Sequence, residues 1–162
     1  MTGISPAVAV GLVARMLREG FEGAPGPWTY FTDTAVGTGV LATIDTLTAS
    51  QASQVGGPGH TTIAGHVHHL ESSVTLTTRA LRGEAASRDR GHSWTVSVVD
   101  DAAWAALRAS LRRAYQELVV AVGMRSTWDE DAIGTAFGAI AHTAYHLGAI
   151  RQRLSAAEGG RA

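Results

Sequence analysis

Apolar residues recur along this chain at steps of three and four positions, which is the period of an amphipathic helix. The clearest stripe lies in the segment 62–82, where the apolar positions are Ile63, Val67, Leu70, Val74 and Leu81. Similar or weaker stripes predict further helices over 6–18, 35–47, 100–122 and 126–157. We find no useful stretch of the apolar–polar alternation that is typical of strands. The pattern therefore predicts an all-α protein in which four or five helices form an up-and-down bundle.

Breaks between these helices are rich in glycine, proline and polar residues. In the first break, Trp28, Tyr30 and Phe31 are expected to anchor the loop onto the bundle, because aromatic side chains bury large apolar areas. A length of 162 residues favours a single domain spanning 1–162. The predicted loops are 21–34, 54–60 and 84–97.

Composition narrows the classes of function. The formal net charge is −1, which gives no electrostatic reason to expect a nucleic acid or a membrane surface as partner. The chain has no cysteine, which excludes disulfides, thiolate ligands and a cysteine nucleophile and fits a cytoplasmic protein. No apolar run approaches the roughly 20 residues that a membrane span needs, and the first 20 residues are read as a helix, not a signal peptide.

The candidate chemistry lies in the histidines. His142 and His146 are four positions apart on a predicted helix, so both imidazoles lie on one face about one turn apart. A helix uses this spacing to offer two nitrogen ligands to one metal ion, although the same spacing also arises in proteins that bind no metal. Three protein ligands would leave a coordination position open for water or a substrate, as in catalytic metal sites.

A third ligand is expected from the helix over 62–82, which carries three histidines. Helical phase places His66 nearest the apolar stripe and His69 farther round the same side, whereas His68 falls on the opposite side. The residues alone therefore leave His66 and His69 as alternatives, with a preference for His66. His60 and His92 lie in predicted loops and receive no role.

Other catalytic patterns are weaker. The His-Glu-x-x-His motif is absent, and Glu71 is the only acid near the histidines, which disfavours a zinc protease or a di-iron centre. Ser72 and Ser73 could donate hydrogen bonds, but no set of nucleophile, base and orienting group is recognisable. Two groups of arginines are predicted to be solvated surface: Arg79, Arg82, Arg88 and Arg90, and Arg108, Arg112 and Arg113.

Two segments carry a family resemblance. Residues 62–71 (TIAGHVHHLE) and 141–152 (AHTAYHLGAIRQ), in that order, resemble the DinB/YfiT-like superfamily, and the similarity extends from about Trp28 to Leu154. The resemblance implies an up-down-down-up four-helix bundle, here with an additional N-terminal helix. It also implies one divalent metal, held by a histidine of the second bundle helix and two of the last.

Carried over residue by residue, the resemblance assigns the metal to His69, His142 and His146, since His69 follows Thr62 by seven positions and precedes Leu70. A ligand is also expected at the rim of the stripe and not inside it. His66 then becomes an additional or alternate ligand, a hydrogen-bonding partner of a ligand, or part of a cavity lining. Imidazole ligands do not choose between Zn, Ni and Fe.

The activity implied by the resemblance is that of a metal-dependent S-transferase acting with a low-molecular-weight thiol on a small-molecule substrate, in a homodimer. No catalytic residue beyond the ligands is assigned. The alternatives are a metal-dependent hydrolase, for which Glu71 is the only candidate base, and a non-enzymatic, stress-related metal-binding bundle. A closed four-histidine site that includes His66 would favour the last reading.

Overall fold

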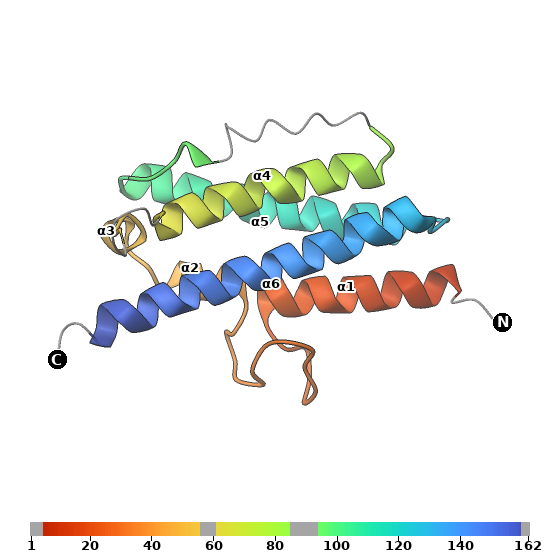
Figure 1. Ribbon diagram of the computed structural model, residues 1–162, viewed down its shortest axis with the longest axis horizontal. Helices are drawn as coiled ribbons and strands as arrows, with labels where there is room; N and C mark the ends of the chain where they lie inside the picture. Colours follow the sequence, from red (N-terminus) through yellow and green to blue (C-terminus); the bar gives the residue numbers. More distant parts are fainter. Residues whose placement is uncertain (1–4, 56–60, 85–93, 160–162) are drawn as a thin grey trace.

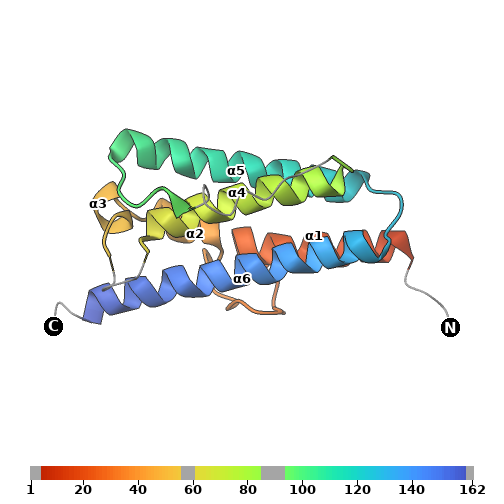
Figure 2. The same ribbon diagram turned by 45° about the horizontal axis from the view of Figure 1, so that its top comes forward.

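The computed structural model describes residues 5–55, 61–84 and 94–159, and within them the protein is helical, with no strand. Four long helices lie side by side (Figures 1 and 2). Their contacts pair α4 with α5 and α6, and α1 with α5 and α6. The predicted all-α class is confirmed. The helices are α1 (Pro6–Glu22), α2 (Val40–Asp45), α3 (Ala49–Ala52), α4 (Ile63–Leu81), α5 (Asp101–Met124) and α6 (Glu130–Gly159).

The N-terminal helix is one of the four long helices and not an addition to them. α1 begins after the cap Ser5 with Pro6 in its first turn, ends at Gly23, where φ is 101°, and packs against α5 and α6. The additional helical segments are instead α2 and α3, which connect α1 to α4. The helix expected over 35–47 is shorter than predicted, because the backbone at Gly37 has a φ of 76° and α2 begins only after Gly39.

The core lies between the four long helices and contains the stripe residues of α4. Ile63, Val67, Leu70, Val74 and Leu81 are all buried, as the three- and four-residue steps predict. α1 and α6 approach each other closely at Gly20, where a Cβ atom would lie 2.8 Å from Cγ2 of Thr143. This close approach fixes the part of α6 that carries the histidine pair.

The loop after α1 is held by a buried carboxylate and not by the aromatic residues expected to anchor it. Trp28 is 61% exposed and Tyr30 is also exposed, so for these two the prediction is wrong; Phe31 alone of the three packs against the core. Glu19 is 1% exposed, and its oxygens accept the backbone N–H groups of Tyr30, Phe31 and Thr32 at 2.7–2.9 Å. The sequence of a proline-rich turn has no periodicity, so it does not predict whether an aromatic ring beside the turn faces the core or solvent.

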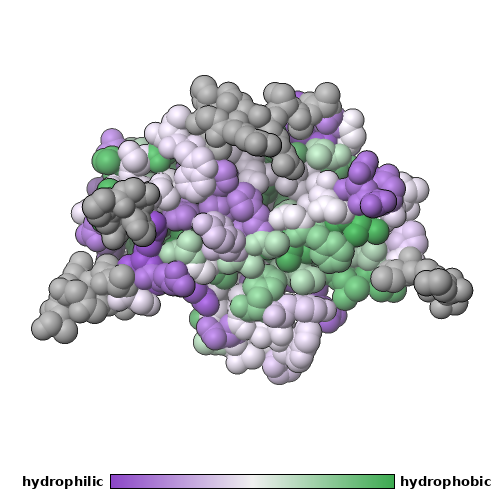
Figure 3. Space-filling model, viewed as in Figure 1, coloured by the Kyte–Doolittle hydropathy of each residue, from purple (hydrophilic) through white to green (hydrophobic). Residues whose placement is uncertain are grey.

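An apolar strip remains on the surface over α1 and α6. Figure 3 shows it as a green band across the right half of this face. We call it the α1–α6 strip; its exposed members are Val8, Leu12, Ile133 and Phe137. No helix in the described ranges is long and apolar enough to cross a membrane.

Candidate metal centre

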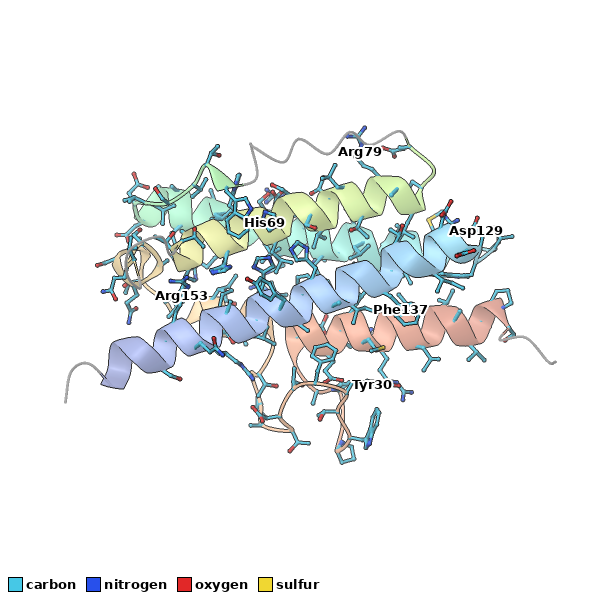
Figure 4. All side chains as sticks on the ribbon, viewed as in Figure 1. Tyr30, His69, Arg79, Asp129, Phe137 and Arg153 are labelled. Carbon is cyan, nitrogen blue, oxygen red and sulfur yellow. The ribbon has the colours of Figure 1, made fainter. Side chains whose placement is uncertain are left out.

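The histidines of the candidate centre come from α4 and α6, which lie against each other over most of their length (Figures 1 and 4). Thr62 caps α4 by accepting the N–H of Gly65 at 3.0 Å, which sets the helical phase of His66 and His69. His66 contacts His146, whereas His69 contacts His142. Because the later residue of α4 meets the earlier residue of α6, the two helices run antiparallel at this point.

Three imidazole nitrogens converge between the helices. The Nε2 atoms of His69 and His142 are 3.2 Å apart, and those of His142 and His146 are 2.8 Å apart. One ligand nitrogen from each of these three residues lies within 4.8 Å of the others. The structure therefore brings together the three histidines that the resemblance selected. His66 is not a member of this group.

These separations fit a bound cation. With metal–nitrogen bonds of about 2.0–2.1 Å, two ligands are about 3.3 Å apart at a tetrahedral ion and about 3.0 Å apart at adjacent octahedral positions. The separations of 2.8 and 3.2 Å lie close to both values. One cation can accept a lone pair from all three nitrogens, so the donor set suits a divalent metal.

The opposite ring nitrogens have partners that hold the ligand nitrogens in place. Nδ1 of His142 lies 2.8 Å from the hydroxyl oxygen of Ser73, and Nδ1 of His146 lies 2.9 Å from Nδ1 of His66. If Nε2 offers its lone pair to a metal, the ring proton must be on Nδ1, where it donates to these partners. Ser73 and His66 therefore orient two of the three imidazoles and select their tautomers.

Burial keeps the inner histidines neutral. It lowers the pKa of His146 to about 3, and the neighbouring charges of His142, His66 and His69 add to the effect. Burial also lowers the pKa of His66 to about 4, with contributions from the charges of Arg153 and His69. A neutral imidazole has a free lone pair, which His146 needs to bind a metal and His66 needs to accept the proton on Nδ1 of His146.

Trp94 completes the outer side of the site, which sequence reasoning did not foresee. Its ring stacks on His69, with the centroids 4.0 Å apart and an interplanar angle of 17°. The segment that carries it passes close to α4 at Gly65, where a Cβ atom would lie 3.0 Å from the carbonyl oxygen of Val96. The spacing of residues predicts neither the stacking on His69 nor the close approach at Gly65, because Trp94 reaches the site from a connecting segment.

No family model, curated protein or solved structure matches this chain. The resemblance to the DinB/YfiT-like superfamily therefore stays a prediction from the two motifs, and the candidate site is defined by the geometry of its histidines.

Several other sequence candidates lie away from the centre. Glu71 accepts a hydrogen bond from Ser110 of α5 at 3.1 Å, so its carboxylate is engaged away from α6. His68 is partly exposed and is not in the converging group, as phase predicted. The exposed pairs Arg79–Glu84 and Arg82–Glu117 fit a solvated surface. The remaining candidates His60, Arg88, His92 and Arg90 lie outside the described residues.

Proposed function

We propose that this chain is a divalent-metal-dependent enzyme that transfers a low-molecular-weight thiol to an electrophilic small molecule, as the DinB/YfiT-like resemblance implies. The observation that carries the proposal is the convergence of three histidine nitrogens in a group that contains no carboxylate. A divalent ion held there would keep its positive charge and lower the pKa of a bound thiol, so that the thiolate forms at neutral pH.

The residues of the chain supply the rest of the arrangement. His69, His142 and His146 would hold the ion, while Ser73 and His66 fix the orientation of His142 and His146. His69 and His142 are only partly buried, in contrast to His146, which has no exposed surface. Trp94 therefore covers the group only in part, and a thiol can approach His69 and His142 from solvent.

The alternatives have less support. A hydrolase needs a base beside the metal, and the only nearby acid identified from the sequence, Glu71, bonds to Ser110 instead. A closed structural site would use His66 as a fourth ligand. However, Nδ1 of His66 faces Nδ1 of His146 at 2.9 Å, on the side of that ring opposite the converging nitrogen.

Elemental analysis of protein purified without a histidine tag tests the metal site. We expect about one divalent metal per chain, lost in both His69→Ala and His146→Ala. His68→Ala is the matched control, because it removes an adjacent histidine that is outside the group, and it should keep the metal. Stoichiometric metal in His146→Ala, or none in the parent protein after reconstitution, would refute the site.

The activity is tested with the metal-loaded protein. We would follow consumption of mycothiol, bacillithiol or glutathione with monobromobimane as the electrophile, before and after treatment with a chelator. Metal-dependent acceleration that disappears in His69→Ala supports thiol transfer. A metal-loaded protein that accelerates none of these reactions would favour a non-enzymatic binding role.

We further propose that the bundle has the up-down-down-up arrangement. The colours in Figures 1 and 2 support it: α1 and α6 progress along the chain from right to left, and α4 and α5 from left to right. The antiparallel pairing of the histidines of α4 with those of α6 is consistent with this arrangement.

We propose that two copies associate through the α1–α6 strip, as the resemblance implies for the family. Phe137 is 57% exposed within the strip and is accompanied by Ile133 one turn earlier on α6. Phe137→Glu would place a charge in the centre of the contact and is expected to yield a monomer in analytical ultracentrifugation, whereas Val98→Glu, outside the strip, should not. A parent protein that is monomeric at all accessible concentrations would refute this association.

A further inference from the structure

Two buried nitrogen atoms near the histidine group have no hydrogen-bond partner among the residues that the structure describes. One is Nε2 of His66, and the other is Nη1 of Arg153. His66 is only 4% exposed, so its side chain is more than nine-tenths buried. Buried polar groups in folded proteins are nearly always paired, and each exception calls for an explanation.

The protonation of His66 follows from its contact with His146. His146 offers Nε2 to the converging group, so its proton is on Nδ1 and is donated to Nδ1 of His66 at 2.9 Å. Nδ1 of His66 is then the acceptor, and the single proton of this neutral ring must be on Nε2. The unpaired atom of His66 is therefore a donor that lacks an acceptor.

Arg153 brings a second donor to the same region. It follows His146 on α6 by seven positions and His142 by eleven, which places all three on one face of the helix. Figure 4 shows its side chain directed from α6 toward the N-terminal part of α4, on which His66 lies.

The charge of Arg153 is not matched by an acid. No salt bridge is formed by Arg153 with the carboxylates of the described residues. The helix dipole of α4 also makes its N-terminal end the positive end, which disfavours a cation nearby. A guanidinium and an imidazole N–H that both lack acceptors provide the chemistry that binds an anionic oxygen group.

We propose that His66 Nε2 and Arg153 bind the carboxylate of a small molecule whose reactive end lies at His69, His142 and His146. The assignment of the reactive end rests on the proposed metal-dependent function. A carboxylate is the group of choice because it offers one oxygen acceptor for each of the two donors, and its single charge matches the single charge of Arg153. The substrate class is thus narrowed to carboxylate-bearing molecules.

Three related ligands separate the two ends of the proposed site. N-acetylcysteine carries a thiol and a carboxylate, N-acetylcysteamine carries the thiol alone, and N-acetylalanine carries the carboxylate alone. Binding of each to the zinc-loaded protein would be measured by isothermal titration calorimetry. We expect N-acetylcysteine to bind at least about tenfold more tightly than N-acetylcysteamine, in line with charge-assisted hydrogen bonds.

Arg153→Gln should abolish this preference and the binding of N-acetylalanine, while helical content and zinc content stay those of the parent protein. The matched control is Arg113→Gln, because Arg113 is an exposed arginine of α5, and it should keep the preference. Equal affinity for the two thiols in the parent protein, or a preference that persists in Arg153→Gln, would overturn the carboxylate subsite. Displacement of N-acetylalanine by inorganic phosphate at equal concentration would overturn the assignment to carboxylates.

The design also separates this subsite from the proposed function. Arg153-dependent binding of N-acetylalanine without any binding of the two thiols would support the subsite and contradict thiol transfer. Binding of both thiols with equal affinity would leave thiol transfer standing and remove the subsite.

Discussion

Substitution of Ser73 by alanine is the sharpest test of how the centre is held. The hydroxyl of Ser73 lies 2.8 Å from Nδ1 of His142, and alanine removes this acceptor while leaving the backbone of α4 unchanged. Without it, the ring of His142 loses the bond that fixes both its orientation and its tautomer. The expected effect is weaker metal binding in a protein that remains folded.

The magnitude follows from the surroundings of His142. Loss of a hydrogen-bonding partner of a metal ligand costs about 10- to 100-fold in metal affinity, or about 1.4–2.7 kcal/mol. His142 is partly exposed, so water can replace the hydroxyl as acceptor. We therefore expect a loss near the lower end of this range, about tenfold.

Zinc affinity would be measured at neutral pH by competition with a chromophoric chelator. Ser72→Ala is the matched control, because it makes the same chemical change one position away, where no hydrogen bond to the converging histidines is found. Circular dichroism would verify that both variants keep their helical content. A change of less than about threefold in Ser73→Ala, or an equal change in Ser72→Ala, would refute the orienting role of Ser73.

Three further predictions concern stability. Glu19→Gln replaces an acceptor that takes three backbone N–H groups, and should lower the free energy of unfolding by about 2–4 kcal/mol in urea titrations, more than Glu22→Gln does. In the metal-free protein, the pKa values of His66 and His146 are lowered, so the unfolded state binds more protons than the folded state below about pH 6.5. The free energy of unfolding should therefore decrease as the pH is lowered, by up to about 1.4 kcal/mol per pH unit for each ring. Urea midpoints measured with chelator between neutral pH and about pH 5 would show this slope, and a flat profile would contradict it. Trp104→Phe should cost about 1–3 kcal/mol in the same assay, because it leaves the carbonyl of Leu47 without the indole N–H that donates to it at 2.8 Å.

The acid dependence of Glu19 has a separate range. Burial alone would raise the pKa of Glu19, but the N–H groups of Phe31, Tyr30 and Thr32, together with the Thr32 hydroxyl, outweigh it and lower the pKa below its ordinary value of 4.5. A lowered carboxyl pKa stabilises the fold above the unfolded value and loses this contribution as the pH falls through the folded value. The effect of Glu19 therefore begins below the pH at which the histidine effect starts.

The helices could be predicted because the residue pattern that specifies each of them lies within the helix itself. The apolar stripe of α4 predicts which face of the helix is buried, whatever that face packs against; its members include Ile63, Val67, Leu70 and Val74. The pair His142 and His146 is also local, since one helical turn fixes the relation of the two rings. Phase further separated His68 from the site, and in the structure it lies outside the converging group.

The parts that could not be predicted depend on contacts between distant segments. Glu19 lies in an amphipathic helix like any surface acid, and only the path of residues 30–32 turns it into a buried acceptor. Trp94 reaches His69 from a connecting segment, for which periodicity gives no direction. Phase placed His66 nearest the stripe but could not show that its contact with His146 uses Nδ1 of both rings.

The charge pattern of the site links the two proposals. The converging group contains no carboxylate, Glu71 is engaged by Ser110, and Arg153 adds a positive charge nearby. A divalent ion in this partly buried environment would leave an excess of positive charge, and each interaction with an anion is stronger there than in bulk water. Neutral or cationic molecules cannot offset this excess, whereas a molecule with one thiolate and one carboxylate offsets it at both ends. The same electrostatics that would ionise the thiol at His69, His142 and His146 therefore also select the carboxylate at His66 and Arg153.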